Sequence, residues 1–105
     1  MTKSTRQILE EAKALISEQE RWGKGEWYRD GCMCIEGALA KASDIEPYEV
    51  RNDDPIVELI LKSIPEDFAG GFDWRFNTLV NFNDHPDTTH EDVMKLFERA
   101  ILSCD

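Results

Sequence analysis

Hydrophobic side chains recur every three or four residues in three segments of the chain, at about residues 5–20, 55–64 and 89–104. This is the spacing of one buried helix face, so each segment predicts an amphipathic helix. Residues 34–42 predict a shorter helix, whose mostly small side chains would let a neighbouring element pack closely. Residues 72–82 fit both the helical and the strand period, and a short helix is favoured. The pattern predicts a mainly α fold, a small bundle of four to five helices.

Polar residues and prolines mark the expected helix ends. Ser4 and Thr88 each have a glutamine or glutamate three residues later, which is the spacing of a capping box. Asp54 stands directly before Pro55, and this pair is typical of an N-cap followed by the first helical residue. Pro65 should end the same helix, because proline cannot donate the backbone hydrogen bond that a helix needs.

The segment at residues 22–33 contains tryptophans, glycines and an Asp30-Gly31 pair flanked by alternating bulky side chains. An Asp-Gly pair suits a two-residue hairpin turn, because both central positions of that turn need a positive φ. We therefore expect a Trp-rich loop or short hairpin that packs against the helices.

The chain has 105 residues, of which 41% are hydrophobic, and this size suits a single domain over residues 1–105. No apolar run approaches the ~18 residues of a membrane-spanning helix, and the first residues lead into an amphipathic pattern rather than a signal peptide. The three cysteines are an odd number, which suits a reducing compartment better than a disulfide framework. We expect a soluble, cytoplasmic protein.

Acidic residues outnumber basic ones by 22 to 12, and the net charge of −10 argues against direct binding to nucleic acid or to an anionic membrane. Residues 1–43 contain seven of each sign, whereas residues 44–105 contain fifteen acidic and five basic ones, so the whole excess lies there. Five of these acids stand near expected helix starts, where the helix dipole favours negative charge. Most of the others could form an acidic face that binds a basic partner; they are Asp44, Glu46, Glu49, Glu58, Glu66, Asp67, Asp73, Asp84 and Glu98.

Three motifs together resemble those of a family of short, uncharacterised bacterial and bacteriophage proteins, a domain of unknown function. They are Trp22-x-x-Gly25-x-Trp27, Arg29-Asp30 followed by Cys32, Cys34 and Gly37-Ala38-Leu39, and Asn83-Asp84-x-Pro86-x-Thr88. The resemblance covers nearly the whole chain and implies the helical outline and a link to bacteria or phages. The family has no established reaction, so the resemblance assigns no catalytic residue.

The candidate metal ligands are Cys32, Cys34, His85 and His90, because thiolate and imidazole groups can form a zinc site. One residue between the two cysteines is tighter than the usual spacing, so no metal ion is favoured and no cofactor is expected. Cys34 also lies where a helix should begin, and the helix dipole there would favour a nucleophilic thiolate. The favoured interpretation is that the cysteines pack as small hydrophobic side chains.

Trp22, Trp27, Tyr28 and Trp74 could form a binding surface, because tryptophan and tyrosine dominate interface hot spots. A chain of this size also needs large side chains to fill its core, and core packing is the favoured interpretation. Trp27 and Tyr28 are adjacent and should point in different directions. We expect one of them to be exposed as an anchor for a partner.

These features favour a non-enzymatic interaction protein of phage or mobile-element type that inhibits a host or defence protein by occupying its basic, nucleic-acid-binding surface. The sequence contains no phosphate-binding loop, dinucleotide fingerprint or nucleophile elbow. One alternative is a small zinc- or thiol-dependent enzyme that uses the candidate cysteines and histidines. Another is a dimeric regulatory or structural module that buries the Trp-rich loop between two copies, so we expect a monomer or a homodimer.

Overall fold

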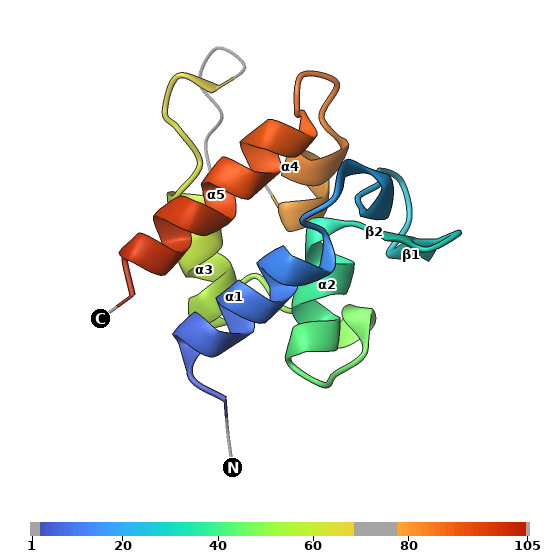
Figure 1. Ribbon diagram of the computed structural model, residues 1–105. Coiled ribbons are helices and arrows are strands. Elements are labelled where there is room, and N and C mark those ends of the chain that lie inside the picture. The colour runs from blue at the N-terminus through green and yellow to red at the C-terminus, as the bar shows by residue number, and fades with distance from the viewer. Residues whose placement is uncertain (1–2, 69–77, 105) are drawn as a thin grey trace.

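The computed structural model describes residues 3–68 and 78–104, and these residues are mainly helical, as the hydrophobic pattern predicts (Figure 1). The described α-helices are α1 (Thr5–Leu15), α2 (Ile35–Ala42), α3 (Pro55–Lys62), α4 (Leu79–Asp84) and α5 (His90–Leu102). A two-stranded antiparallel hairpin precedes α2, and its strands are β1 (Tyr28–Arg29) and β2 (Cys32–Met33). Two short 3₁₀ helices, η1 (Gln19–Arg21) and η2 (Pro47–Glu49), lie on either side of the hairpin and α2 along the chain.

Helix α1 packs against both α2 and α5 (Figure 1). Helix α5 also contacts α3, while α2 contacts α4, η2 and the hairpin. The inward faces of these helices form one core, whose largest fully buried side chains include Phe82, Phe97, Leu9, Ile16 and Ile35. Burying a side chain of this size contributes about 1.5–3 kcal/mol relative to leaving it in water, so these apolar faces hold the helices together.

Side-chain caps begin α1 and α3 as the sequence predicts. The Ser4 hydroxyl accepts a hydrogen bond from the Gln7 amide at 3.1 Å, while the Gln7 side chain accepts one from the Ser4 amide. Asp54 caps α3 by accepting a hydrogen bond from the Ile56 amide, and Pro55 is the first residue of that helix. Each cap satisfies a backbone N–H group that has no partner inside its helix.

The cap of α5 differs from the prediction by one residue. Thr89, not Thr88, is the N-cap, and it forms the capping box with Asp92 rather than with Glu91. Thr88 is buried, and its hydroxyl donates a hydrogen bond to the Phe82 carbonyl oxygen at 2.6 Å. Because that hydroxyl is bound to the last turn of α4, it does not cap α5.

Helix α1 is shorter than its hydrophobic pattern suggests, because it ends at Leu15 rather than near Glu20. Ile16 leaves the helical conformation, and its carbonyl oxygen lies 2.8 Å from Nε2 of His90 in the first turn of α5. The hydrophobic repeat nevertheless continues, because the Ile16 side chain is fully buried. The repeat therefore locates the core position correctly but not the end of the helix.

The short helix predicted at residues 72–82 lies partly outside the described residues. Residues 79–82 are helical, and α4 continues to Asp84. Thr78 caps this helix by accepting a hydrogen bond from the Asn81 amide at 3.1 Å. Two adjacent glycines at residues 70–71 predict a turn in the sequence, but they and the side chain of Trp74 fall outside the described residues.

The hairpin forms where the Asp30-Gly31 pair predicts it. Asp30 and Gly31 have φ angles of 48° and 85°, which lie in the left-handed region that a two-residue turn requires. The Cys34 amide donates a hydrogen bond to the Trp27 carbonyl oxygen at 3.3 Å, which continues the pairing beyond β1 and β2. The hairpin is thus joined directly to the start of α2.

Gly37 in α2 lies against this hairpin. A methyl group at its Cα would stand 2.4 Å from the Trp27 carbonyl oxygen and 3.3 Å from the Tyr28 ring. The Tyr28 hydroxyl also donates a hydrogen bond to the Gly37 carbonyl oxygen at 3.3 Å. Glycine weakens an isolated helix, but at this position it allows the hairpin to touch α2.

The variant Gly37→Ala tests this close contact. Alanine favours a helix over glycine by about 1 kcal/mol, so helix propensity alone would stabilise the protein. We expect instead a loss of about 1–3 kcal/mol in the free energy of unfolding, because the Trp27 backbone must move. Urea denaturation measures the change, with Lys41→Ala on the exposed side of α2 as the control. A Gly37→Ala protein as stable as the wild type would contradict the predicted clash.

Candidate functional site

Asn83 lies where α4, α2 and the loop before the hairpin meet, and its side chain is fully buried. Its Oδ1 atom accepts hydrogen bonds from Trp22 Nε1 at 2.7 Å and from the Ile35 amide at 3.0 Å. Its Nδ2 atom donates to the Gly23 carbonyl oxygen and to the Asp84 carboxylate, both at 3.0 Å. The amide is therefore fully hydrogen-bonded, which removes the free-energy cost of burying a polar group.

Asp84, the next residue of α4, holds the following part of the same loop. Besides the hydrogen bond from Asn83, its Oδ1 atom accepts one from the Gly25 amide at 2.9 Å. Gly25 has a φ angle of 89°, a conformation that residues with side chains rarely adopt. Lys24 Nζ donates a hydrogen bond to the His85 carbonyl oxygen at 2.7 Å. Successive hydrogen bonds thus fix this loop to the end of α4.

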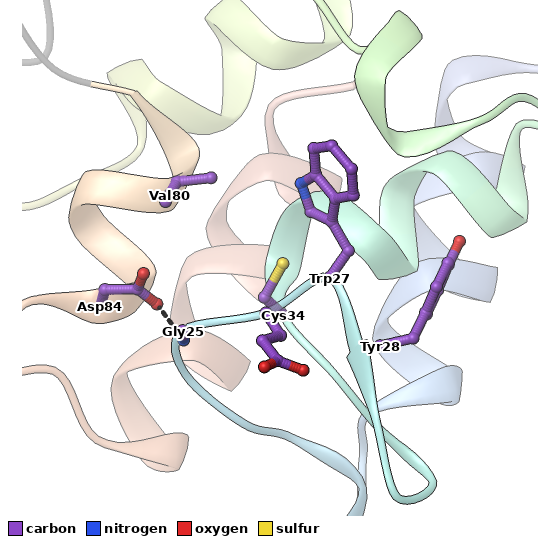
Figure 2. A pocket seen from close by; sticks show the side chains of 7 residues that line it. Gly25, Trp27, Tyr28, Cys34, Val80 and Asp84 are labelled. Atoms are coloured by element: carbon purple, nitrogen blue, oxygen red, sulfur yellow. Dashed lines mark hydrogen bonds between the residues drawn. The ribbon is translucent and has the colours of Figure 1, made fainter.

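A pocket of about 420 Å³ lies between this loop, the start of α2 and α4 (Figure 2). We call it the indole pocket, and it is lined by Gly25, Glu26, Trp27, Tyr28, Cys34, Val80 and Asp84. In Figure 2, Asp84 and Tyr28 lie on opposite sides of the view, with the Cys34 sulfur and the Trp27 side chain between them. The volume lies within the range of pockets that bind small molecules.

Trp27 forms one wall of the indole pocket and is held by Glu36. The Trp27 Nε1 atom donates a hydrogen bond to a Glu36 carboxylate oxygen at 2.9 Å. Burial raises the pKa of the Glu36 carboxyl, because desolvation of the ionised form outweighs the hydrogen bond from the indole. Trp27 is 41% exposed, so this contact presents the ring to solvent in a defined position.

Cys34 is buried in the wall of the pocket, as the N-cap of α2. Its sulfur accepts a hydrogen bond from the Gly37 amide at 3.3 Å. Burial is the largest influence on this thiol and raises its pKa, while the hydrogen bonds from the helix start act in the opposite direction. Cys34 therefore lacks the lowered pKa that an activated nucleophile needs.

The other candidate metal ligands are bound elsewhere. The Cys32 thiol donates a hydrogen bond to the Glu20 carbonyl oxygen at 2.9 Å, and His85 Nδ1 accepts one from the Asp87 amide at 3.1 Å. His90 makes its contact with the end of α1. Among the residues that the structure describes, no group of three or more His, Cys, Asp or Glu side chains could hold a metal ion. The described residues therefore do not form the zinc site for which the sequence offers candidate ligands.

Three of the acidic residues predicted to bind a partner come together beside the indole pocket. They line a hollow of about 590 Å³ between α2, η2 and the hairpin, which we call the acidic hollow; its lining residues are Tyr28, Lys41, Asp44, Ile45, Glu46 and Glu49. Tyr28 lines both depressions, so they share a wall. Burial, and after it the negative charge of Glu46, raises the pKa of the Tyr28 hydroxyl.

The other predicted acidic residues do not line this hollow. Glu58 and Glu98 form ion pairs, with Lys62 at 2.8 Å and with Lys13 at 3.6 Å. The remaining positions are Glu66 and Asp67 after α3, Asp84 in the indole pocket, and Asp73, which lies outside the described residues. The described structure therefore gathers Asp44, Glu46 and Glu49 at one place and separates them from the rest.

Four large apolar side chains are exposed on the hairpin and on the segment after α2, and two of them, Tyr28 and Ile45, line the acidic hollow. Trp27 and Tyr28 are 41% and 45% exposed, and Ile45 and Tyr48 are 37% and 72% exposed. The expectation of core packing is therefore wrong for Trp27 and Tyr28, of which both, rather than one, are exposed. It is confirmed for Trp22, which packs against the core while its indole N–H is hydrogen-bonded inside the protein.

Sequence patterns do not mark Ile45, Tyr48 or Asn83 as site residues. Ile45 and Tyr48 lie in a segment whose hydrophobic residues do not recur at a helical or strand spacing, so nothing in the sequence indicates which side chains face solvent. Asn83 carries one usable signal, because it follows Leu79 by four residues and therefore occupies a core-facing helical position. A polar residue at such a position must find hydrogen-bond partners inside the protein.

The model of one protein family, described as a family of unknown function (DUF6197), matches residues 1–102 of the chain. No curated protein and no solved structure matches the chain. In residues 3–68 and 78–104, no helix is both long enough and apolar enough to cross a membrane. These comparisons supply no activity or ligand.

The variant Asn83→Ala tests the buried amide. It leaves Trp22 Nε1 and the Ile35 amide without their acceptor, and we expect a loss of at least about 3 kcal/mol in the free energy of unfolding. Chemical denaturation measures this loss. Asn81→Ala, an exposed change in the same helix, should alter stability by no more than about 0.5 kcal/mol. Equally small losses in the two variants would show that the network contributes little.

The variant Glu36→Gln tests the carboxyl that holds Trp27, since glutamine keeps an acceptor for the indole N–H but does not ionise. The folded protein retains the Glu36 proton at higher pH than the unfolded chain does, because its pKa is raised above the ordinary value of 4.5. The stability of the wild type relative to the variant should therefore fall as pH rises from 4.5 through the raised pKa.

Urea denaturation over about pH 4 to 8 measures this difference in stability. The exposed Glu20→Gln variant is the control, and its difference from the wild type should not show the same fall with pH. A wild type that gains stability relative to Glu36→Gln as pH rises would mean that the indole contact outweighs burial.

Proposed function

The chain belongs to DUF6197, a family of unknown function, and we propose that it is a non-enzymatic protein that binds a basic partner protein through the acidic hollow. The observation that carries this proposal is the location of its exposed apolar side chains. Of the five large hydrophobic side chains exposed among the described residues, Tyr28 and Ile45 line the hollow, Tyr48 belongs to η2, which carries part of its lining, and Trp27 lines the adjoining indole pocket.

This combination of side chains suits a protein interface. Tryptophan and tyrosine supply much of the binding free energy at interface centres, where neighbouring contacts exclude water. Here the exposed rings adjoin Asp44, Glu46 and Glu49, so an apolar contact area is bordered by negative charge. A partner that carries lysine and arginine around an apolar centre would match both features.

The carboxylates of the hollow are available to such a partner. Lys41 is the basic residue among those that line it. Asp44 lies 3.8 Å from Lys3 in an exposed contact, which contributes little to stability. One oxygen of Glu49 accepts a hydrogen bond from the Glu46 amide at 3.0 Å, which fixes the Glu49 carboxylate at the start of η2. The overall charge of −10 would steer the protein toward a basic surface.

We further propose that the partner's basic surface is one that otherwise holds nucleic acid. Carboxylates offer arginine and lysine the same charge-assisted hydrogen bonds that phosphates offer. A protein seated on such a surface would block nucleic acid from it. In a cell, the chain would then act as a phage-borne protein that inhibits a host or defence protein. The motif resemblance to bacterial and phage proteins supports this proposal.

Removing the charge of the acidic hollow tests the proposal. The wild type and the triple variant Asp44→Asn/Glu46→Gln/Glu49→Gln serve as baits in a bacterial lysate, and captured proteins are identified by mass spectrometry. We expect the affinity of a captured basic protein to fall about tenfold or more in the variant. Wild-type binding should weaken steeply as salt is added, and duplex DNA should displace the chain from its partner.

The control Asp53→Asn/Glu66→Gln/Asp67→Asn removes the same formal charge from exposed positions around α3, and its binding should match that of the wild type. Equal losses in both variants would mean that only net charge matters. Binding that does not change from low to high salt would contradict the proposal. Light scattering tests the dimeric alternative, because a dimer that dissociates on Trp27→Ala would show that the aromatic surface binds a second copy.

A further inference from the structure

The indole pocket adjoins the acidic hollow, and the proposal above assigns no ligand to it. Its lining combines the aromatic rings of Trp27 and Tyr28 with the carboxylates of Glu26 and Asp84. No lysine or arginine of the described residues lines it. Negative charge beside an aromatic wall favours the binding of a cation, because the ring face and the carboxylates both attract positive charge.

We propose that the indole pocket receives one arginine side chain of the partner protein, an inference that rests on the proposed function. The pocket and the acidic hollow share Tyr28, so a partner seated on the hollow would place its neighbouring side chains at the mouth of the pocket. The volume of about 420 Å³ is large enough to receive an inserted side chain.

The carboxylate of Asp84 is already positioned for this role. Hydrogen bonds from Asn83 Nδ2 and the Gly25 amide hold its Oδ1 atom. Its second oxygen accepts no hydrogen bond from the residues that the structure describes, so it is available to a guanidinium N–H group. A carboxylate fixed before binding loses little conformational entropy when the partner arrives, which favours affinity.

The other walls fit arginine better than lysine. The guanidinium group is planar and weakly hydrated, so it stacks on an aromatic face such as that of Trp27, whereas an ammonium group is compact and strongly hydrated. Val80 and the buried Cys34 offer an apolar surface to the methylene groups of the arginine side chain. Glu36 fixes the Trp27 ring through its indole N–H and adds a further negative charge nearby.

Short peptides test the pocket without the partner. The probes are acetyl-Gly-Arg-Gly-amide and the matched peptide with citrulline, which keeps the shape of arginine but carries no charge. A single side chain is expected to bind at about millimolar Kd, which NMR titration detects. We expect the arginine peptide to shift the Trp27 indole N–H and Gly25 amide signals, and the citrulline peptide to bind about tenfold more weakly. The variant Trp27→Phe assigns the indole signal.

Two variants locate the binding site. Asp84→Asn keeps an acceptor for Gly25 and Asn83 but removes the charge, and we expect the arginine peptide to bind about tenfold more weakly to it. Glu26→Gln changes an exposed side chain that the fold does not need, so it tests the pocket even if the Asp84 variant is unstable. The triple variant of the acidic hollow should still bind the peptide with nearly the wild-type affinity, because its substitutions lie outside the pocket.

Each other outcome overturns the inference. Equal affinity for arginine and citrulline peptides would show that charge is not recognised, and equal affinity for a lysine peptide would remove the preference for a guanidinium group. Peptide binding that is unchanged in both Asp84→Asn and Glu26→Gln would place the interaction elsewhere. Failure of the proposed function is distinct, because it would appear as loss of partner capture while the peptide still binds the pocket.

Discussion

The position of the Trp-rich loop on the helices depends on one uncharged side chain, the buried amide of Asn83. It joins three segments that are far apart in the chain, namely the loop at Trp22 and Gly23, the first turn of α2 at Ile35, and α4 itself. The Ile35 amide is one of the backbone donors that every helix start leaves without an internal partner. Asn83 therefore caps a helix from a distance of 48 residues and fixes the loop that leads into the hairpin.

Both candidate surfaces are built outward from this network. Asp84 follows Asn83 directly and fixes Gly25, which lines the indole pocket. The hairpin is then placed on α2 by the close approach at Gly37, which brings Tyr28 to the wall between the pocket and the acidic hollow. The exposed aromatic side chains are thus held by hydrogen bonds and packing within the chain itself, and their position does not depend on contacts with a partner.

The sequence predicts local features well because their causes are local. The helical repeat, the Ser4 and Asp54 caps and the Asp30-Gly31 turn each depend on residues within a few positions of one another. The capping box of α5 differs from the prediction because the Thr88 hydroxyl bonds back to the preceding helix α4, and α1 ends early where Ile16 contacts the distant His90 in α5. The gathering of Asp44, Glu46 and Glu49 beside Tyr28 also requires the packed fold, and no spacing in the sequence predicts it.

Each strand of the hairpin has only two residues, and an isolated hairpin is at best marginally stable in water even when its strands are longer. Its shape comes from α2 and from the loop bound to α4, so it forms only as those elements fold. A synthetic peptide of residues 22–33 would contain Trp27 and Tyr28 without the surface that they form here. The surface belongs to the whole folded chain, and it could not be transferred to another protein by grafting this segment alone.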